Sequence, residues 1–307
     1  MAIFVSTACL KGENDLIQVL ESYQLAGFRS IELGSLHKYS PDITDYLWGY
    51  KADFLVHHYF PPPLNPFMVN LASTDRDILT KSLKQIKSSL ELCSKLGVKL
   101  FSFHAGFRAD PSPGITFIGH EPEPYERALG IFIDSVRKID VWAKEYNIKL
   151  AVENNVLAKY NIVNGDNPYL LLCCCEEFEE FFRQITSDNV GILLDLGHLQ
   201  VTAHNLGFNK DGFIDKLEDK VFALHIHDNH GEMDEHLGLN IQSWACQAIY
   251  RKKLVDIPWI LESSNLSLEE IRKNFELLTG LRGRLAESGG IPAKFDPSCF
   301  MASPPCP

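Results

Sequence analysis

Short apolar runs alternate along this chain with longer segments in which apolar residues recur every three or four positions. The short runs are typical of buried strands, and the longer segments of helices that bury one face. The predicted strands are Ile3–Thr7, Ser30–Leu33, Phe54–His57, Val98–His104, Ile148–Glu153, Val190–Asp195, Val221–His227 and Ile257–Glu262. The predicted helices are Asp15–Ala26, Asp75–Leu96, Tyr125–Tyr146, Glu176–Ile185, Asp211–Leu217, Ile241–Arg251 and Leu268–Leu278. Strands alternating with helices through short links predict a parallel sheet.

Such a sheet is either open and doubly wound or closed into a (β/α)8 barrel. No Gly-x-Gly-x-x-Gly or Walker loop follows a predicted strand, which removes the main support for a nucleotide-binding open sheet. We therefore predict an α/β fold, a single (β/α)8 TIM barrel over residues 1–285 with a C-terminal extension over residues 286–307. Tyr59–Thr74 and Gly106–Pro124 contain several prolines. They are predicted as extended loops at the C-terminal face of the strands, where they would shape a pocket.

The composition of the 307 residues is that of a globular protein, with 45% hydrophobic and 22% charged residues. Forty acidic residues against 29 basic ones give a net charge of −11, which repels a nucleic-acid backbone at long range. No apolar run approaches the roughly 20 residues of a membrane-spanning helix. The eight cysteines show no Cys-x-x-Cys spacing, and Cys173–Cys175 are adjacent. We expect reduced thiols in a cytoplasmic protein.

Histidines and acidic residues stand at or just after the C-terminal ends of most predicted strands. They are His57, His104, Glu153, Asp195, His198, His225, Asp228, Asp234, Glu235, His236 and Glu262. Each one alone has an ordinary explanation, such as a hydrogen-bonded structural histidine or a helix-capping carboxylate. A barrel brings the C-terminal ends of all its strands to one face, so these side chains are expected to converge.

Convergence of these groups predicts a metal site. Burying several carboxylates together without a counter-charge is costly. Oxygen and imidazole ligands without cysteine suit Mn²⁺, Zn²⁺, Fe²⁺, Co²⁺ or Mg²⁺. The residues thus favour a metalloenzyme over a barrel without a metal, and they leave the identity of the ion open.

Six sequence segments carry a resemblance to a known superfamily. They read LVHHYF, FSFHAG, LAVEN, GILLDLGH, ALHIHDN with the DEH that follows it, and ILES, and they extend over residues 55–263. In these segments the chain resembles the xylose-isomerase-like TIM barrels, also called AP endonuclease family 2. That superfamily includes endonuclease IV and many sugar isomerases and epimerases.

The resemblance implies two layouts for the site. In a single-metal sugar enzyme, the ligands would be Glu153, Asp195, His225 and Glu262, and the catalytic acid/base pair would be Glu153 and Glu262. A three-metal endonuclease would use the same four ligands for a central ion. It would hold two further ions with His57, His104 and Glu153 and with His198, Asp234 and His236. The number of ions therefore lies between one and three.

The residues around the ligands favour the sugar branch. Asp195-Leu196-Gly197-His198 resembles the sugar-isomerase-type barrels, whereas the endonuclease branch usually has Asp-Thr-Cys-His. Gly238-Leu239-Asn240 departs from the Gly-Glu-Gly turn of both branches. No cluster of basic and aromatic residues that could grip a duplex occurs in the strand-end loops. We predict a metal-dependent isomerase or epimerase of a sugar, sugar phosphate or polyol. An abasic-site endonuclease and a non-catalytic barrel with a relic metal site remain the alternatives.

Substrate contacts are expected from Glu32, Arg108, His198 and His227. His58 should point away from His57 if the strand continues, so only one of the two should be a ligand. The expected partner is a small sugar-like molecule, with neither nucleic acid nor membrane, and the chain is compatible with a homo-oligomer.

Overall fold

Eight parallel strands close into a barrel in the order in which they occur along the chain. The computed structural model describes residues 2–13, 15–35, 37–112, 116–117, 119–252 and 254–287. The strands are β1 (Ile3–Ser6), β2 (Ser30–Leu33), β3 (Asp53–His57), β4 (Leu100–His104), β5 (Lys149–Glu153), β6 (Val190–Asp195), β7 (Val221–Ile226) and β8 (Trp259–Leu261). β8 pairs with β1, which confirms the predicted (β/α)8 TIM barrel.

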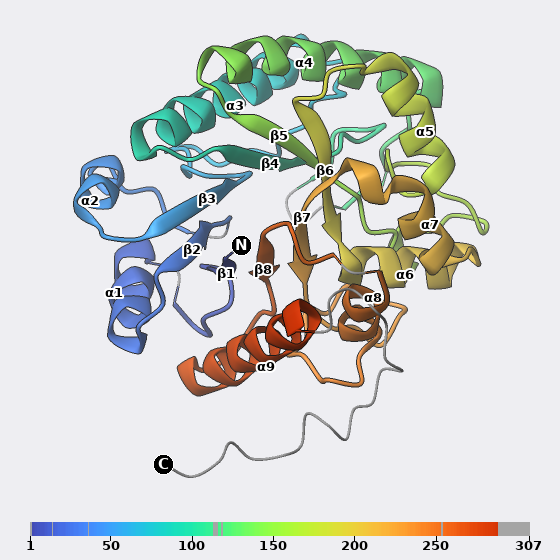
Figure 1. The fold of residues 1–307 in the computed structure, drawn as a ribbon. Coiled ribbons are helices and arrows are strands. Elements are labelled where there is room, and N and C mark those ends of the chain that lie inside the picture. The colour runs from blue at the N-terminus through green and yellow to red at the C-terminus, as the bar shows by residue number, and fades with distance from the viewer. Residues whose placement is uncertain are drawn as a thin grey trace.

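Helices surround the strands on the outside of the barrel (Figure 1). They are α1 (Leu16–Ala26), α2 (Ile43–Gly49), α3 (Arg76–Leu96), α4 (Tyr125–Glu145), α5 (Cys175–Gln184), α6 (Leu196–Leu206), α7 (Lys210–Leu217), α8 (Trp244–Lys252) and α9 (Leu268–Glu287), with short 3-10 turns η1 (Lys159–Asn161) and η2 (Glu218–Lys220). Local chemistry sets several ends. Asp75 caps α3 by accepting hydrogen bonds from the Asp77 and Ile78 amides, and Gly97 ends it in the left-handed conformation that glycine adopts without strain.

The helix prediction was wrong in three places. It missed α2, whose seven residues bury only Ile43 and Leu47 and so show too little periodicity. It missed α6 because that helix begins directly after β6 and has no polar face to mark it. It ended the last helix at Leu278, nine residues before α9 ends at Glu287. Residues 288–307, most of the predicted extension, lie outside the described residues.

The barrel interior is layered along the strands. Its lower layer is apolar and consists of Phe4, Leu55, Ala151, Leu193, Ala223 and Ile260. Strand side chains two positions apart share a face, so the next inward layer holds Ser6, His57, Glu153, Asp195, His225 and Glu262. The apolar layer closes the barrel beneath the polar layer. The strand register therefore gathers the predicted ligands at one level inside the C-terminal end.

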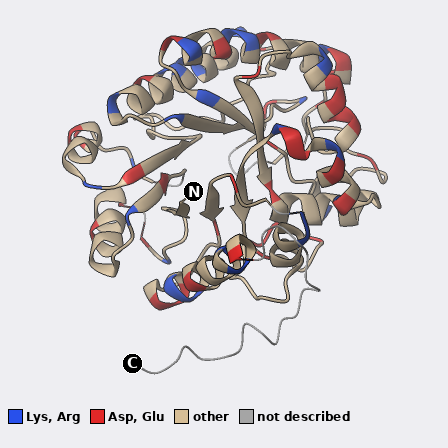
Figure 2. Ribbon diagram, in the orientation of Figure 1, with Lys and Arg blue, Asp and Glu red and all other residues tan. Residues whose placement is uncertain are grey.

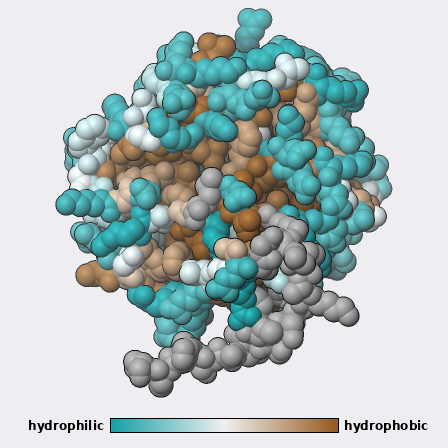
Figure 3. Space-filling model, in the orientation of Figure 1, coloured by the Kyte–Doolittle hydropathy of each residue, from teal (hydrophilic) through white to brown (hydrophobic). Residues whose placement is uncertain are grey.

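The outer surface has a different character. Figure 2 shows lysines and arginines gathered on α3 and α4, on the outside of the barrel. On the face in Figure 3, hydrophobic residues show toward the middle, inside a rim of hydrophilic ones. None of the described helices is both long and apolar enough to cross a membrane. The six cysteines among the described residues are all free.

Candidate metal centre

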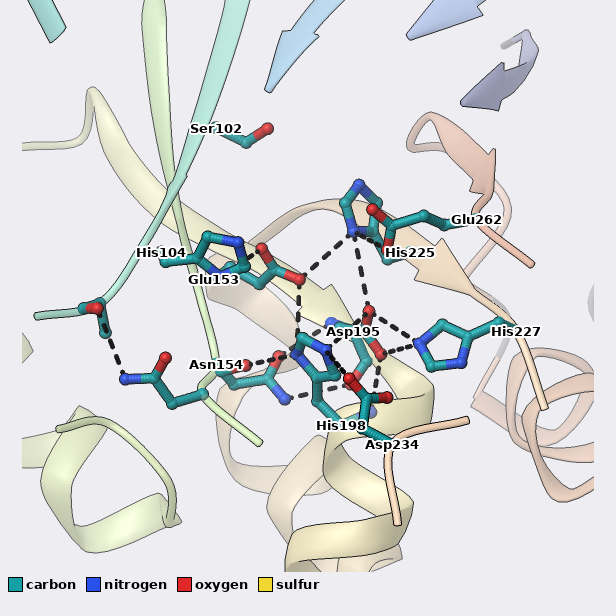
Figure 4. Close-up of polar contacts among 12 residues, drawn as sticks. Ser102, His104, Glu153, Asn154, Asp195, His198, His225, His227, Asp234 and Glu262 are labelled. Carbon is teal, nitrogen blue, oxygen red and sulfur yellow. Dashed lines mark hydrogen bonds and ion pairs between the residues drawn. The ribbon is translucent and has the colours of Figure 1, made fainter. Parts of the chain in front are cut away.

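Four predicted ligands converge at the C-terminal ends of the strands. Glu153, Asp195, His225 and Glu262 each offer one donor atom, and these atoms all lie within 4.8 Å of one another. Nδ1 of His225 is central: it lies 3.3 Å from Oε1 of Glu153, 3.7 Å from Oδ2 of Asp195 and 2.8 Å from Oε2 of Glu262 (Figure 4). Strand pairing sets this arrangement, because Asp195 is the direct partner of His225 across β6 and β7.

Glu32 fixes the ring of His225 from behind. Nε2 of His225 donates a hydrogen bond to Oε1 of Glu32 at 2.9 Å, and both side chains are buried. With its proton on Nε2, the ring turns the lone pair of Nδ1 toward the carboxylates, as in the carboxylate–histidine pairs that orient metal ligands. Glu32 does not line the cavity above the site. From this position Glu32 can orient His225 as a metal ligand. It does not contact the cavity in which the sequence predicted that it would bind substrate.

The charges and unsatisfied atoms of this group fit a divalent cation. Burial would raise the pKa of Asp195, but His198 and His227 hold it well below its ordinary value. Burial likewise opposes ionisation of Glu262, yet His225 lowers its pKa to about 2. Oε2 of Glu153 and Nδ1 of His225 are buried and make no well-aligned hydrogen bond in the described part of the chain, although charged or imidazole groups lie within 3.1 Å of each. Ionised carboxylates around unsatisfied donor atoms are the environment that a hard or borderline cation fills.

A second group shares Glu153. Its Oε2 lies 3.3 Å from Nε2 of His57 and 3.1 Å from Nδ1 of His104. His58 also joins this group, with a donor atom within 4.8 Å of those of His57 and His104. His58 was expected to point away from His57 only if the strand continued, and β3 ends at His57, where the chain turns. Both ring nitrogens of His58 are buried without a hydrogen-bond partner among the described residues.

A third group lies on the other side of Asp195 and consists of His198, His227, Asp234 and His236. Oδ2 of Asp234 is 3.5 Å from Nε2 of His198 and 3.1 Å from Nε2 of His236. Burial opposes protonation of His236, but Asp234 raises its pKa to about 9. The ring of His227 stacks on that of His236 at 3.8 Å between centroids and contacts the Asp195 carboxylate at 3.1 Å. His227 thus supports Asp195 and His236 and does not line the cavity.

Two residues that sequence reasoning did not single out hold these groups in place. Asn154 joins the ends of β5 and β6: its Oδ1 accepts from the Asp195 amide at 2.8 Å, and its Nδ2 donates to the Asp195 carbonyl at 3.1 Å. Gly197 leaves room for His227, since a Cβ there would lie 2.1 Å from the ring. The glycine in Asp195-Leu196-Gly197-His198 was the available signal, because close packing is one reason for a glycine inside a helix.

A cavity of about 300 Å³ opens above the donors. Glu153 and Glu262 line it together with His57, His104, His198, Asp234 and His236. The rest of its wall consists of Ala8, Ser35, Phe107, Asn155, Val156, Tyr160, Asn161, Leu170 and Ser264. The segment after β5 therefore supplies much of the wall, from Asn155 to Leu170, and sequence reasoning missed it.

The two loops predicted to shape the pocket contribute less. Gly106–Pro124 supplies Phe107, while no residue of Tyr59–Thr74 is part of the wall. Arg108, expected to contact substrate, is also absent from the wall. Its Nε donates to the Glu123 carbonyl at 3.0 Å and its Nη1 to the Asn167 carbonyl at 3.4 Å. Arg108 joins two loops, so we do not carry it into the proposed site.

The arrangement of strands and ligands agrees with a comparison of the sequence with protein families. The family model described as xylose isomerase-like TIM barrel matches residues 21–256, more than half of the chain. The chain belongs to this family. Membership confirms the resemblance seen in the strand-end segments, and the structure adds where this member places each side chain.

The chain is also similar to other proteins in sequence and to solved structures in fold. An uncharacterised protein, MJ1614, of Methanocaldococcus jannaschii is 27% identical over 244 residues, covering 77% of this chain and 81% of its own length. A D-tagatose 3-epimerase-like protein superposes with a TM-score of 0.72 at 22% identity, covering 94% of this chain and all of its own. IOLI protein, solved with a zinc atom, gives a TM-score of 0.67 at 17% identity, covering 93% and 99%. At these identities the structural likeness shows the fold.

Proposed function

We propose that this chain is a divalent-metal-dependent isomerase or epimerase of a small sugar or polyol. The observation that carries the proposal is the convergence of Glu153, Asp195, His225 and Glu262 within 4.8 Å, with Glu153 and Glu262 lining a cavity of about 300 Å³. A cavity of that size suits a small molecule. The fold is shared with a D-tagatose 3-epimerase-like protein and with a zinc-bound protein, which is consistent with the proposal.

In this proposal Glu153, Asp195, His225 and Glu262 hold one ion, of a kind the donors leave open among Mn²⁺, Zn²⁺, Co²⁺, Fe²⁺ and Mg²⁺. An ion held there would supply Lewis acidity toward the carbonyl group of the substrate. One of Glu153 and Glu262 removes the proton from the adjacent carbon, and the C–H electron pair moves into the carbonyl group. A carboxylic acid then returns a proton to carbon. Both glutamates line the cavity and flank Nδ1 of His225.

Exchange of a carbon-bound proton tests this function. Protein loaded with Mn²⁺ or Zn²⁺ should incorporate deuterium at a carbon next to the carbonyl of at least one ketose in D2O, as followed by NMR. Chelator should abolish the exchange. Glu262→Gln and Glu153→Gln should abolish it too, and Glu145→Gln, an exposed site on α4, serves as the matched control. Absence of exchange across ketopentoses, ketohexoses and inososes would contradict the proposal.

The other two donor groups favour a second candidate, a multinuclear phosphodiesterase acting on abasic DNA. They bring His57, His104, His198, Asp234 and His236 into the same cavity. Two ions can stabilise the attacking and leaving oxygens of a phosphodiester. The 300 Å³ cavity and the absence of Lys and Arg from its described wall speak against a bound duplex. Chelator-sensitive nicking of an abasic-site oligonucleotide at low protein concentration would reverse the order of the two candidates.

A further inference from the structure

Tyr160 is an exposed aromatic residue in the cavity wall. It is 60% exposed and lies in η1, in the segment after β5. A single exposed aromatic residue on a protein surface is ordinary, as at Trp48 on α2. Tyr160 differs because it lines the cavity that Glu153 and Glu262 also line. Phe107, the described wall residue with the other phenyl ring, is only 6% exposed, so Tyr160 has the more accessible ring.

The segment that carries Tyr160 is fixed to the loop after β7. The amide of Lys159 donates to the Glu232 carbonyl at 3.1 Å, and Nζ of Lys159 pairs with the Glu232 carboxylate at 3.0 Å. Asn205, in the last turn of α6, donates from Nδ2 to the carbonyls of Leu157 at 2.8 Å and of Glu232 at 3.1 Å. The backbone beside Tyr160 is therefore held before a ligand binds, which reduces the entropy cost of binding.

The phenol ring of Tyr160 suits a polyhydroxylated molecule. The face of an aromatic ring carries partial negative charge. The C–H bonds of a sugar are weakly positive because each carbon also bears an oxygen, so they pack favourably on such a face. A tyrosine offers this contact at a low cost in side-chain entropy. Ser35 and Ser264 supply hydroxyl groups in the same wall, so apolar and polar contacts are both available to one ligand.

We propose that Tyr160 is a substrate-binding residue whose ring packs against the carbon-bearing face of a sugar or polyol, while the reacting carbonyl group lies toward Glu153 and Glu262. This inference rests on the proposed function for the location and the class of the substrate. The role concerns binding and not proton transfer. Loss of the ring therefore raises the dissociation constant and KM, and leaves kcat largely unchanged.

Saturation-transfer NMR tests the contact. The protein is deuterated except for its tyrosine rings, loaded with Zn²⁺ and mixed with D-tagatose, D-fructose or L-ribulose. Tyr160 is the only tyrosine of the described wall, so saturation of tyrosine ring protons should reach the C–H protons of at least one sugar. Tyr160→Phe should abolish the transfer, because the phenylalanine ring is deuterated. Tyr39→Phe, at a 47% exposed position outside the described wall, should keep it. No transfer to any of these sugars overturns the inference.

Affinity tests the ring. Tyr160→Ala should raise the dissociation constant of the bound sugar about 3- to 10-fold in calorimetry, as for loss of one aromatic contact. Tyr160→Phe keeps the ring and should bind within about twofold of the original chain. Tyr39→Ala is the matched control and should bind as the original chain does. Because Tyr160 is exposed, its variants should fold, which circular dichroism checks. Unchanged affinity in Tyr160→Ala, or an equal loss in Tyr160→Phe, contradicts the assignment.

Deuterium exchange separates this inference from the proposed function. Saturation transfer from Tyr160 to a sugar that incorporates no deuterium would refute the isomerase and leave the binding role of Tyr160 standing. Exchange with the same KM in Tyr160→Ala as in the original chain would leave the isomerase standing and refute the role of Tyr160.

Discussion

At the scale of single residues, Glu32 shows how a buried carboxylate acts without reaching the cavity. Its hydrogen bond with Nε2 of His225 leaves Nδ1 as the nitrogen available to an ion. A carboxylate in this position also makes the ring a stronger ligand. Glu32 and Glu262 therefore have different tasks although both contact His225.

Two substitutions of Glu32 should weaken metal binding to different degrees. Glu32→Gln keeps an acceptor for Nε2 and loses the charge, so a modest decrease in affinity is expected. Glu32→Ala also frees the ring and should decrease affinity about 10- to 100-fold. Calorimetric titration with Zn²⁺ measures both, with Glu145→Gln as control. The same affinity in Glu32→Ala as in the original chain would show that Glu32 does not orient the ligand.

Gly197 gives a prediction about packing. A Cβ at this position would lie 2.1 Å from the His227 ring, so Gly197→Ala should push His227 off Asp195 and His236. The expected loss is about 1–3 kcal/mol in the free energy of unfolding. Denaturant unfolding measures it, and His227→Ala in the Gly197→Ala background should recover part of the loss. Equal losses in the single and the double variant would mean that the clash is relieved elsewhere.

At the scale of elements, the loops after the strands decide how many groups of candidate metal ligands the site contains. Asp234 and His236 lie in the segment after β7, and His198 lies in the first turn of α6. They contact one another and also line the cavity. The geometry is compatible with an additional ion and equally with side chains that orient substrate.

We expect the second role, as the single-metal layout implies. His236→Ala should lower activity without lowering the amount of metal bound per chain. Elemental analysis of the original chain and the variant, purified side by side without chelator, measures this. Loss of one whole equivalent of metal would mean that a multinuclear layout is the correct one.

At the scale of the whole molecule, the buried donors link metal binding to protons. Burial opposes protonation of His225, but Glu262, Glu32 and Glu153 outweigh it and raise its pKa well above the ordinary value. The metal-free ring is then protonated at neutral pH. An ion that binds Nδ1 displaces that proton. The affinity of the protein for the ion should therefore keep rising with pH through neutrality, and should not level off at about 6.5, the ordinary pKa of histidine.

Proton release at pH 7 can be counted by calorimetry in buffers of different ionisation enthalpy. A fraction approaching one proton per ion is expected from His225 alone. Metal removal should also lower thermal stability, since an ion at 100 times its dissociation constant stabilises the fold by about 2.7 kcal/mol. Binding without proton release at pH 7 would contradict the raised pKa of His225.

The sequence predicted most of the barrel and its ligand-bearing face. The eight strands were found within two residues at either end, because buried strands read as apolar runs with sharp boundaries. Helices with a clear polar face, such as α3 and α4, were found as well. α6 was missed because its residues are buried nearly all round, which removes the contrast on which helix prediction depends.

Sequence alone determined the barrel, the family resemblance and the set of side chains at the strand ends, since these follow from apolar periodicity and from residue type. Tertiary structure decided the rest. It placed Glu32 behind His225, turned His58 toward His104, drew Arg108 away from the cavity and brought Asn161 into its wall. These outcomes depend on how loops fold over the strand ends, and loop paths follow from contacts between distant residues that no local pattern encodes.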